Sequence, residues 1–179
     1  MACVKVTKEI IDSCIGFIAG YKADKAIRFY GVRCAEFPEM LLAGNEKESK
    51  IMSLINTGHS YNTTAKMLGV AKGTVTRYIS SYNNRVTFYY EFIAFYDFIN
   101  PVLNMDLKSI LPDSDNSFIR SCMDKGVYTV GDFFDMYIHY PLKEAEKRTS
   151  AIRSERKRRI FNAISNECYS LLAEVLIYE

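Results

Sequence analysis

The chain has 179 residues, of which 49% are hydrophobic and 25% charged, and its formal net charge is +2. This composition suits one large or two small folded domains and excludes a disordered or collagen-like chain. The first residues lack the pattern of a secretory signal, and no run reaches the roughly 18–20 apolar residues that a membrane span needs, so we expect a cytoplasmic protein without membrane contact. The five cysteines are widely spaced, so we expect reduced, mostly buried thiols and no metal site.

Apolar residues recur at helical spacing along the chain, and no run of strict alternation indicates a sheet. Residues 1–44 are expected to form a first helical unit, which begins with a helix over residues 7–19 capped by Thr7. Residues 45–87 are expected to form a second unit. Its helices are predicted near residues 46–55, 61–68 and 72–82. Glycines match between the two units at an offset of 38 residues, which favours tandem three-helix units over the alternative, chance similarity of short helical hairpins.

An aromatic segment follows at residues 88–110. Its main helix is predicted over residues 88–99, and Asn83 and Asn84 are expected to separate it from the preceding helix. We interpret this helix as core or as a connecting and dimerising element, with base stacking as a further alternative.

Residues 111–179 are expected to form a helical C-terminal domain. Gly126 predicts a turn between two helices, and Thr129 with Asp132 resembles an N-terminal capping arrangement. The last helix is expected to start near Ser150 or Ser154 and to run almost to the end of the chain, with an apolar stripe on one side.

The charged residues are distributed unevenly. Residues 45–87 carry six Lys and Arg against two Asp and Glu, whereas residues 88–147 carry five against ten. Residues 148–179 carry six against four and include the basic run RSERKRR at 153–159. Because nucleic-acid binding needs local rather than global positive charge, these two basic regions are the candidate contacts with nucleic acid.

The segment 58–81, GHSYNTTAKMLGVAKGTVTRYISS, resembles the helix-turn-helix of bacterial regulators, resolvases and transposases. Ala65 stands where the motif needs a small side chain between its helices, and Gly69 stands at the turn, where a positive φ is usually needed. The apolar positions of the motif hold Leu68, Val70, Val75 and Tyr78. Ala71 departs from the pattern, since Ser or Thr commonly caps the recognition helix.

This resemblance implies that the third helix enters the major groove of double-stranded DNA, while the start of the second helix faces the phosphate backbone. Arg77 can then donate two hydrogen bonds to a guanine edge, and Lys72 can contact a phosphate. The residues implied to bind DNA are Ser60, Tyr61, Asn62, Lys72, Gly73, Thr74, Thr76, Arg77 and Ser80. The alternative is a helix-turn-helix that makes only protein contacts.

The first unit keeps the spacing of the second but not its charges. Glu36, Pro38 and Glu39 stand at the positions of its third segment, and two carboxylates would repel phosphates. We interpret this unit as a structural or dimerising copy, with a bipartite DNA reader as the alternative.

Residues 111–166 resemble the C-terminal domain of the bacterial RNA polymerase α subunit, on the run FIRSCMDKGVYTVGDFF and the Ser-initiated helix after it. The resemblance implies a possible second DNA contact. Its positions here are Lys125, Gly126, Ser154, Arg156, Lys157 and Arg158. The chain lacks the family's Gly-Lys-Ser run before the last helix. For the basic run, a solvated face, an acidic partner or the preceding acidic segment are the alternatives.

Together these patterns predict an all-α fold: tandem helix-turn-helix units followed by a helical, helix-hairpin-helix-like C-terminal domain. No P-loop, acidic metal cluster or Ser/His/Asp pattern is present, and His59 and His139 have no recognisable partners, so we expect no enzyme activity and no cofactor.

The expected function is sequence-specific binding of double-stranded DNA as a transcription regulator of a bacterium, phage or mobile element. A homodimer or higher homo-oligomer is expected, because one helix-turn-helix reads only a few base pairs. The alternatives are a phage DNA-packaging factor of the small-terminase type, and an adaptor that acts on RNA polymerase or another regulator.

Overall fold

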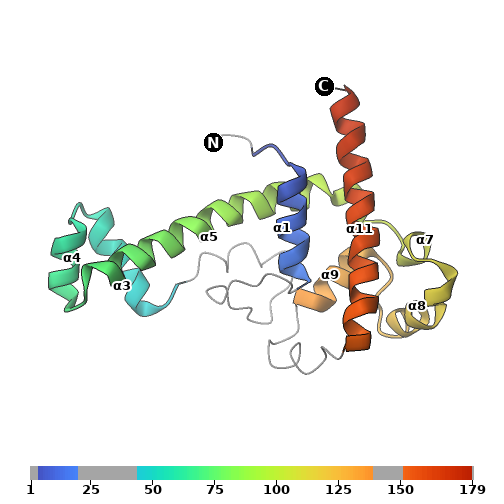
Figure 1. Cartoon of the computed structure of the whole chain (residues 1–179), viewed down its shortest axis with the longest axis horizontal. Helices are drawn as coiled ribbons and strands as arrows, with labels where there is room; N and C mark the ends of the chain where they lie inside the picture. Colours follow the sequence, from blue (N-terminus) through green and yellow to red (C-terminus); the bar gives the residue numbers. More distant parts are fainter. Residues whose placement is uncertain (1–3, 20–43, 139–150, 179) are drawn as a thin grey trace. The chain divides into compact units, whose positions relative to one another are not determined.

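The computed structural model describes residues 4–19, 44–138 and 151–178, and the structural statements below concern these ranges (Figure 1). All regular structure in them is helical, apart from one isolated antiparallel bridge between Asp106 and Thr129. The predicted all-α fold class is therefore confirmed. Over the same ranges, no helix combines the length and the apolar character that crossing a membrane requires.

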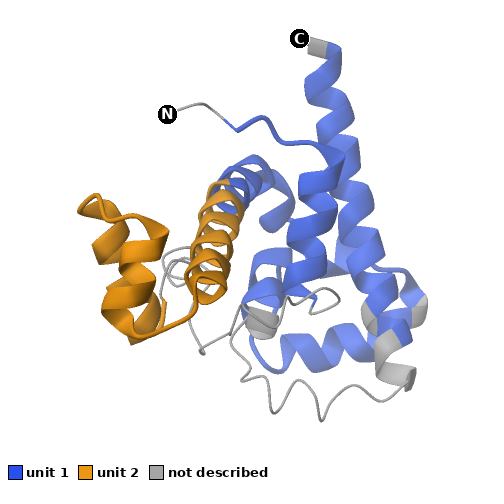
Figure 2. Cartoon of the chain, turned by 60° about the vertical axis from the view of Figure 1, so that its left-hand side comes forward, with its two compact units in different colours: residues 1–37, 91–179 blue, residues 38–90 orange. Residues whose placement is uncertain are grey.

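The chain divides into two compact units, which are described separately (Figure 2). The smaller unit is Pro38–Tyr90, and the larger unit combines Met1–Phe37 with Glu91–Glu179. Most of the predicted first three-helix unit, residues 20–43, lies outside the described ranges, so the tandem arrangement stays a prediction.

The smaller unit contains α3 (Glu46–Asn56), α4 (Tyr61–Leu68) and the first part of α5 (Lys72–Phe98). The side chain of Asn45 caps α3 by accepting a hydrogen bond from the Glu48 amide at 2.9 Å. The Ser60 hydroxyl caps α4 by accepting one from the Thr63 amide at 3.2 Å. At the other end of α4, Gly69 adopts a left-handed conformation with φ 63°, which a side chain would disfavour. The helices predicted at residues 46–55 and 61–68 are confirmed.

A small apolar core holds these helices together. Its buried members are Ile51, Ala65, Val75 and Ile79. Partly buried side chains pack around them, namely Met52, Ile55, Leu68, Val70 and Tyr78. All the positions predicted to be apolar contacts of the motif therefore belong to this core or to its rim.

The prediction of a helix end at Asn83 and Asn84 is wrong. α5 continues through both residues to Phe98 (Figure 1). Asn is a weak helix former, but it costs less than about 1 kcal/mol relative to Ala. Burial of Arg85 directly after the pair, and of Phe92 and Phe95 further on, outweighs this cost.

Among its described residues, the larger unit holds the last part of α5 and six further α-helices. These are α1 (Lys8–Ile18), α6 (Asn100–Leu103), α7 (Leu107–Ile110), α8 (Asn116–Met123), α9 (Val130–Ile138) and α11 (Ala151–Tyr178), with a 3₁₀ turn η1 (Asp113–Asp115) before α8. α1 and α6 each pack against α9 and α11, and α7 packs against α8. Thr7 caps α1, as predicted, by accepting a hydrogen bond from the Ile10 amide at 3.4 Å.

The hairpin between α8 and α9 has the predicted local structure. Gly126 has φ 77° in the turn. The Thr129 hydroxyl accepts a hydrogen bond from the Asp132 amide at 3.1 Å, and the Asp132 carboxylate accepts one from each of the amides of Tyr128 and Thr129 at 3.0 Å. This reciprocal capping box, with Asp in place of the usual Glu, fixes the start of α9.

Aromatic rings form much of the core of the larger unit. Phe92 and Phe95 are fully buried, and the Phe92 ring lies 6.2 Å from the ring of Phe17 on α1. Phe161 on α11 stacks on Phe134 of α9, with centroids 6.0 Å apart. The last part of α5 therefore contributes to the core of the larger unit, which is one of the two roles expected of the aromatic helix.

Three of the five cysteines fall in the described ranges. Cys14, Cys122 and Cys168 are free and buried, as predicted. Burial raises the pKa of the Cys168 thiol to about 12, with a further contribution from the charge of Glu167. Cys3 and Cys34 lie outside the described ranges.

Candidate nucleic-acid interface

The candidate interface is built on α4, the three-residue turn after it, and the start of α5. The turn closes through the Val70 amide, which donates to the Ala65 carbonyl at 3.0 Å, and through the left-handed Gly69. Ala71 has no side-chain acceptor, and the Thr74 amide donates to its backbone carbonyl at 2.9 Å. The amides of Lys72 and Gly73 in the first turn of α5 therefore have no intrahelical acceptor and remain available to an anion.

Eight of the nine residues predicted to bind DNA from this region are exposed. They are Ser60, Tyr61, Asn62, Lys72, Gly73, Thr76, Arg77 and Ser80. Thr74 is the exception, because it is partly buried on a flank of α5 that it shares with the partly buried Tyr78 and Ser81. Thr74 therefore lies at the edge of the exposed face of α5, and its contact with DNA stays a prediction.

Several of these side chains already have local roles. The Ser60 hydroxyl caps α4 and is also within 2.9 Å of the Thr63 hydroxyl. The Thr76 hydroxyl donates to the Lys72 carbonyl at 3.2 Å, which leaves its lone pairs and its methyl group on the exposed side. The Arg77 guanidinium lies 5.8 Å from the centroid of the Tyr78 ring. These contacts restrict the side chains before any ligand binds, which lowers the entropic cost of binding.

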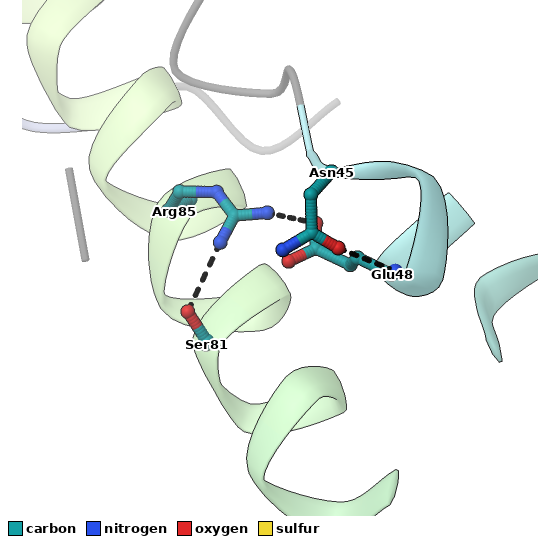
Figure 3. A network of polar contacts seen from close by, with 4 residues as sticks. All are labelled: Asn45, Glu48, Ser81 and Arg85. Carbon is teal, nitrogen blue, oxygen red and sulfur yellow. Dashed lines mark hydrogen bonds and ion pairs between the residues drawn. The ribbon is translucent and has the colours of Figure 1, made fainter. Parts of the chain in front are cut away.

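A buried polar network joins α3 to α5 (Figure 3). The guanidinium of Arg85 forms an ion pair with the Glu48 carboxylate, and the two side chains are only 8% and 6% exposed. Arg85 also donates to the Ser81 hydroxyl at 3.0 Å. A Cβ on Gly44 would collide with the Glu48 carboxylate, so a glycine there leaves space for this side chain.

The network determines where the charge of residues 45–87 lies. Of the six cations and two carboxylates in residues 45–87, Arg85 and Glu48 neutralise each other in the interior. The remaining five cations and Glu46 are all exposed, so the net charge of +4 lies entirely on the surface. In addition, the 42 residues from 49 to 90 contain no Asp or Glu.

Sequence reasoning missed two sets of residues in this unit. Glu48 and Arg85 are 37 positions apart, so no local pattern indicates that they pair. Asn83, Asn84 and Thr87 are exposed and lie on the continuation of α5. A repeat at seven-residue spacing could have indicated the second set, because Thr76, Arg77 and Ser80 precede them by seven positions.

The basic run in the larger unit has acidic contacts. Asp115, whose side chain is 3% exposed, lies 3.5 Å from the Arg159 guanidinium and 3.9 Å from that of Arg156. Arg156 also lies over the Phe118 ring, 5.7 Å from its centroid. Of the alternatives for this run, neutralisation by the preceding acidic segment thus has direct contacts in its favour.

The remaining residues of the predicted second DNA contact are less constrained. Lys125, Gly126 and Arg158 are exposed. Ser154 and Lys157 lie within α11, but their side chains fall outside what the structure describes. This contact therefore stays a prediction.

His59 is partly buried, and His139 lies outside the described ranges. Within those ranges, no three His, Cys, Asp or Glu side chains come together as the ligands of a metal ion would.

Comparison of the chain with models of protein families, with curated proteins and with solved structures gives no match. What the chain does is therefore inferred from its own residues.

Proposed function

We propose that the chain binds double-stranded DNA in a sequence-specific manner through α4 and α5 of the smaller unit, and that it acts as a transcription regulator. The observation that carries this proposal is the placement of charge. Residues 45–87 present a surface of net charge +4, with their one interior carboxylate neutralised by Arg85, and this charge attracts the phosphate backbone. The absence of carboxylates from residue 49 to residue 90 means that α4 and the first half of α5 carry no group that repels it.

The exposed side of α5 supplies groups that distinguish base pairs. Arg77 can donate two hydrogen bonds to the O6 and N7 atoms of guanine. Thr76 and Ser80 are exposed beside it and can contact thymine methyl groups or phosphates. Lys72 and the first-turn amides of α4 and α5 are suited to phosphates, because helix N-termini attract anions.

A helix of this kind contacts only a few base pairs, so we further propose that two copies bind paired half-sites. A regulator of a bacterium, phage or mobile element would gain the affinity it needs in this way.

The test is selection of binding sites from a random pool of duplex DNA, at about 50 mM and about 200 mM salt. Wild type is compared with Arg77→Ala and with Arg120→Ala, which removes an exposed arginine of the larger unit. We expect wild type and Arg120→Ala to enrich one sequence and Arg77→Ala to lose about tenfold in discrimination at one base pair.

Other outcomes would replace the proposal. Salt-sensitive binding without any enriched sequence would indicate a packaging or architectural role. Absence of binding at both salt concentrations would contradict DNA binding and favour the adaptor that acts on a polymerase or another regulator.

A further inference from the structure

The exposed face of α5 continues beyond the residues predicted to read DNA. Each of three exposed residues has an exposed counterpart seven positions later: Thr76 and Asn83, Arg77 and Asn84, Ser80 and Thr87. Since an α-helix has 3.6 residues per turn, a residue and its seventh successor differ by only about 20° around the axis. The later three therefore extend the same stripe by about two turns, within the smaller unit.

The residue types on this extension are unusual for a helix face that meets only water. Such faces are commonly built from Lys, Glu, Gln and Ala, which favour the helix and keep it soluble. Here Asn83, Asn84 and Thr87 are weaker helix formers and carry no charge. The side-chain amide of neither Asn makes a hydrogen bond with another described residue. Their amide groups remain available to a ligand.

The buried side of α5 is held in place next to Asn83 and Asn84. Arg85 follows Asn84 directly, and its buried ion pair with Glu48 ties α5 to the start of α3 (Figure 3). A buried ion pair is directional, whereas apolar contacts tolerate rotation of a helix. The pair therefore fixes the rotation of α5 that leaves Asn83 and Asn84 on the exposed stripe with Arg77.

We propose that Asn83 and Asn84 are specificity-determining residues that read A·T pairs in the major groove. This inference rests on the proposed function of the smaller unit. An Asn amide presents one donor and one acceptor side by side, which match the N7 acceptor and N6 donor of adenine.

The length of the stripe agrees with such a role. At a rise of 1.5 Å per residue, Arg77 and Asn84 lie about 10 Å apart along α5. This distance corresponds to about three base-pair steps of about 3.4 Å each. The amides would thus read positions two to four base pairs from the one that Arg77 contacts.

The test uses the full chain, with Asn83→Ala and Asn84→Ala combined in one variant. Asn162→Ala is the matched control, because Asn162 is an exposed amide within α11 of the larger unit. The site preferred by wild type is first selected from random duplex DNA. Each variant is then titrated with that duplex and with duplexes that carry a single base-pair change at each position.

We expect the double variant to lose about tenfold in discrimination at one or two A·T positions near the position read by Arg77. At the base pair that Arg77 contacts, the double variant should discriminate as well as wild type. The control Asn162→Ala should discriminate as well as wild type at every position. Since Ala is the better helix former, thermal unfolding should show the double variant to be no less stable than wild type, which separates lost reading from lost structure.

Two results would overturn the inference and are distinguishable. If wild type enriches a sequence and the double variant keeps every preference, the proposed function stands and the role of the amides is refuted. If wild type enriches no sequence at all, both the proposed function and this inference fail.

Discussion

Replacement of Arg85 by Met tests how far the buried ion pair holds the smaller unit together. Arg85 and Glu48 are 8% and 6% exposed, and Met fills most of the volume of the arginine side chain. The variant therefore leaves the Glu48 carboxylate buried without its cation. Breaking a buried pair in this way costs about 3–5 kcal/mol. Since natural domains are stable by about 5–15 kcal/mol, we expect the variant to lose a large share of the free energy of unfolding of the smaller unit.

The chain has no Trp, so urea unfolding is followed by circular dichroism and by hydrogen exchange of the amides of α3 and α4. Exchange reports the smaller unit separately from the larger one. The control is the double variant Glu48→Leu with Arg85→Met, which replaces the pair by apolar side chains and is expected to lie within about 1–2 kcal/mol of wild type. A single variant as stable as wild type, or a double variant as unstable as the single one, would refute the reasoning.

Three further predictions follow from local structure. The hydroxyl of Thr64 is buried without a hydrogen-bond partner among the described residues, so Thr64→Val should raise the free energy of unfolding by about 1 kcal/mol, and a loss of stability would contradict this. Gly69→Ala should destabilise the smaller unit by about 1 kcal/mol, because the φ of Gly69 is 63°. Gly73→Ala should instead stabilise it by about 0.5–1 kcal/mol, because Gly73 is helical and nothing lies within 4 Å of a new Cβ. Equal effects of the two substitutions in urea unfolding would rule out the conformational cause. Burial acts to raise the pKa of Asp132, but hydrogen bonds from the Thr129 and Tyr128 amides and from the Thr129 side chain outweigh it and hold the pKa below its usual value. Its stabilising contribution is then present above the unfolded-state pKa of about 3.9 and is lost as the pH falls through the lower folded-state pKa, so unfolding of wild type but not of Asp132→Asn should show this loss in a pH series.

The elements that could be predicted from the sequence depend on residues close together in the chain. Gly69 at the end of α4 and Thr129 at the start of α9 are both found where the sequence predicts them. Each of these positions is determined within about one helical turn, by a side chain that bonds a nearby amide or by the one residue that accepts a positive φ. Burial of Ala65 and Val75 follows from the same short spacing.

The features that could not be predicted depend on tertiary contacts. The resemblance implies that Thr74 binds DNA, but its position around α5 leaves it partly buried, on the flank that it shares with the partly buried Tyr78. The contacts of Arg156 and Arg159 with Asp115 join residues more than 40 positions apart. A basic run has the same composition whether it faces a phosphate or an internal carboxylate, so only the folded arrangement distinguishes the two.

The wrong helix end at Asn83 and the missed ion pair of Arg85 have a single cause. A helical pattern is recognised by apolar residues on its buried side, and Arg85 interrupts that pattern because an arginine is ordinarily counted as exposed. In the structure Arg85 lies on the buried side of α5, where Glu48 supplies the charge that makes its burial possible. With Arg85 inside, Asn83 and Asn84 fall on the outer side of an uninterrupted helix. The ion pair of Arg85 with Glu48 therefore explains both the missed continuation of the helix and the exposed polar stripe on its outer side. The stability of Arg85→Met and the base-pair discrimination of the Asn variant test these two consequences of one arrangement.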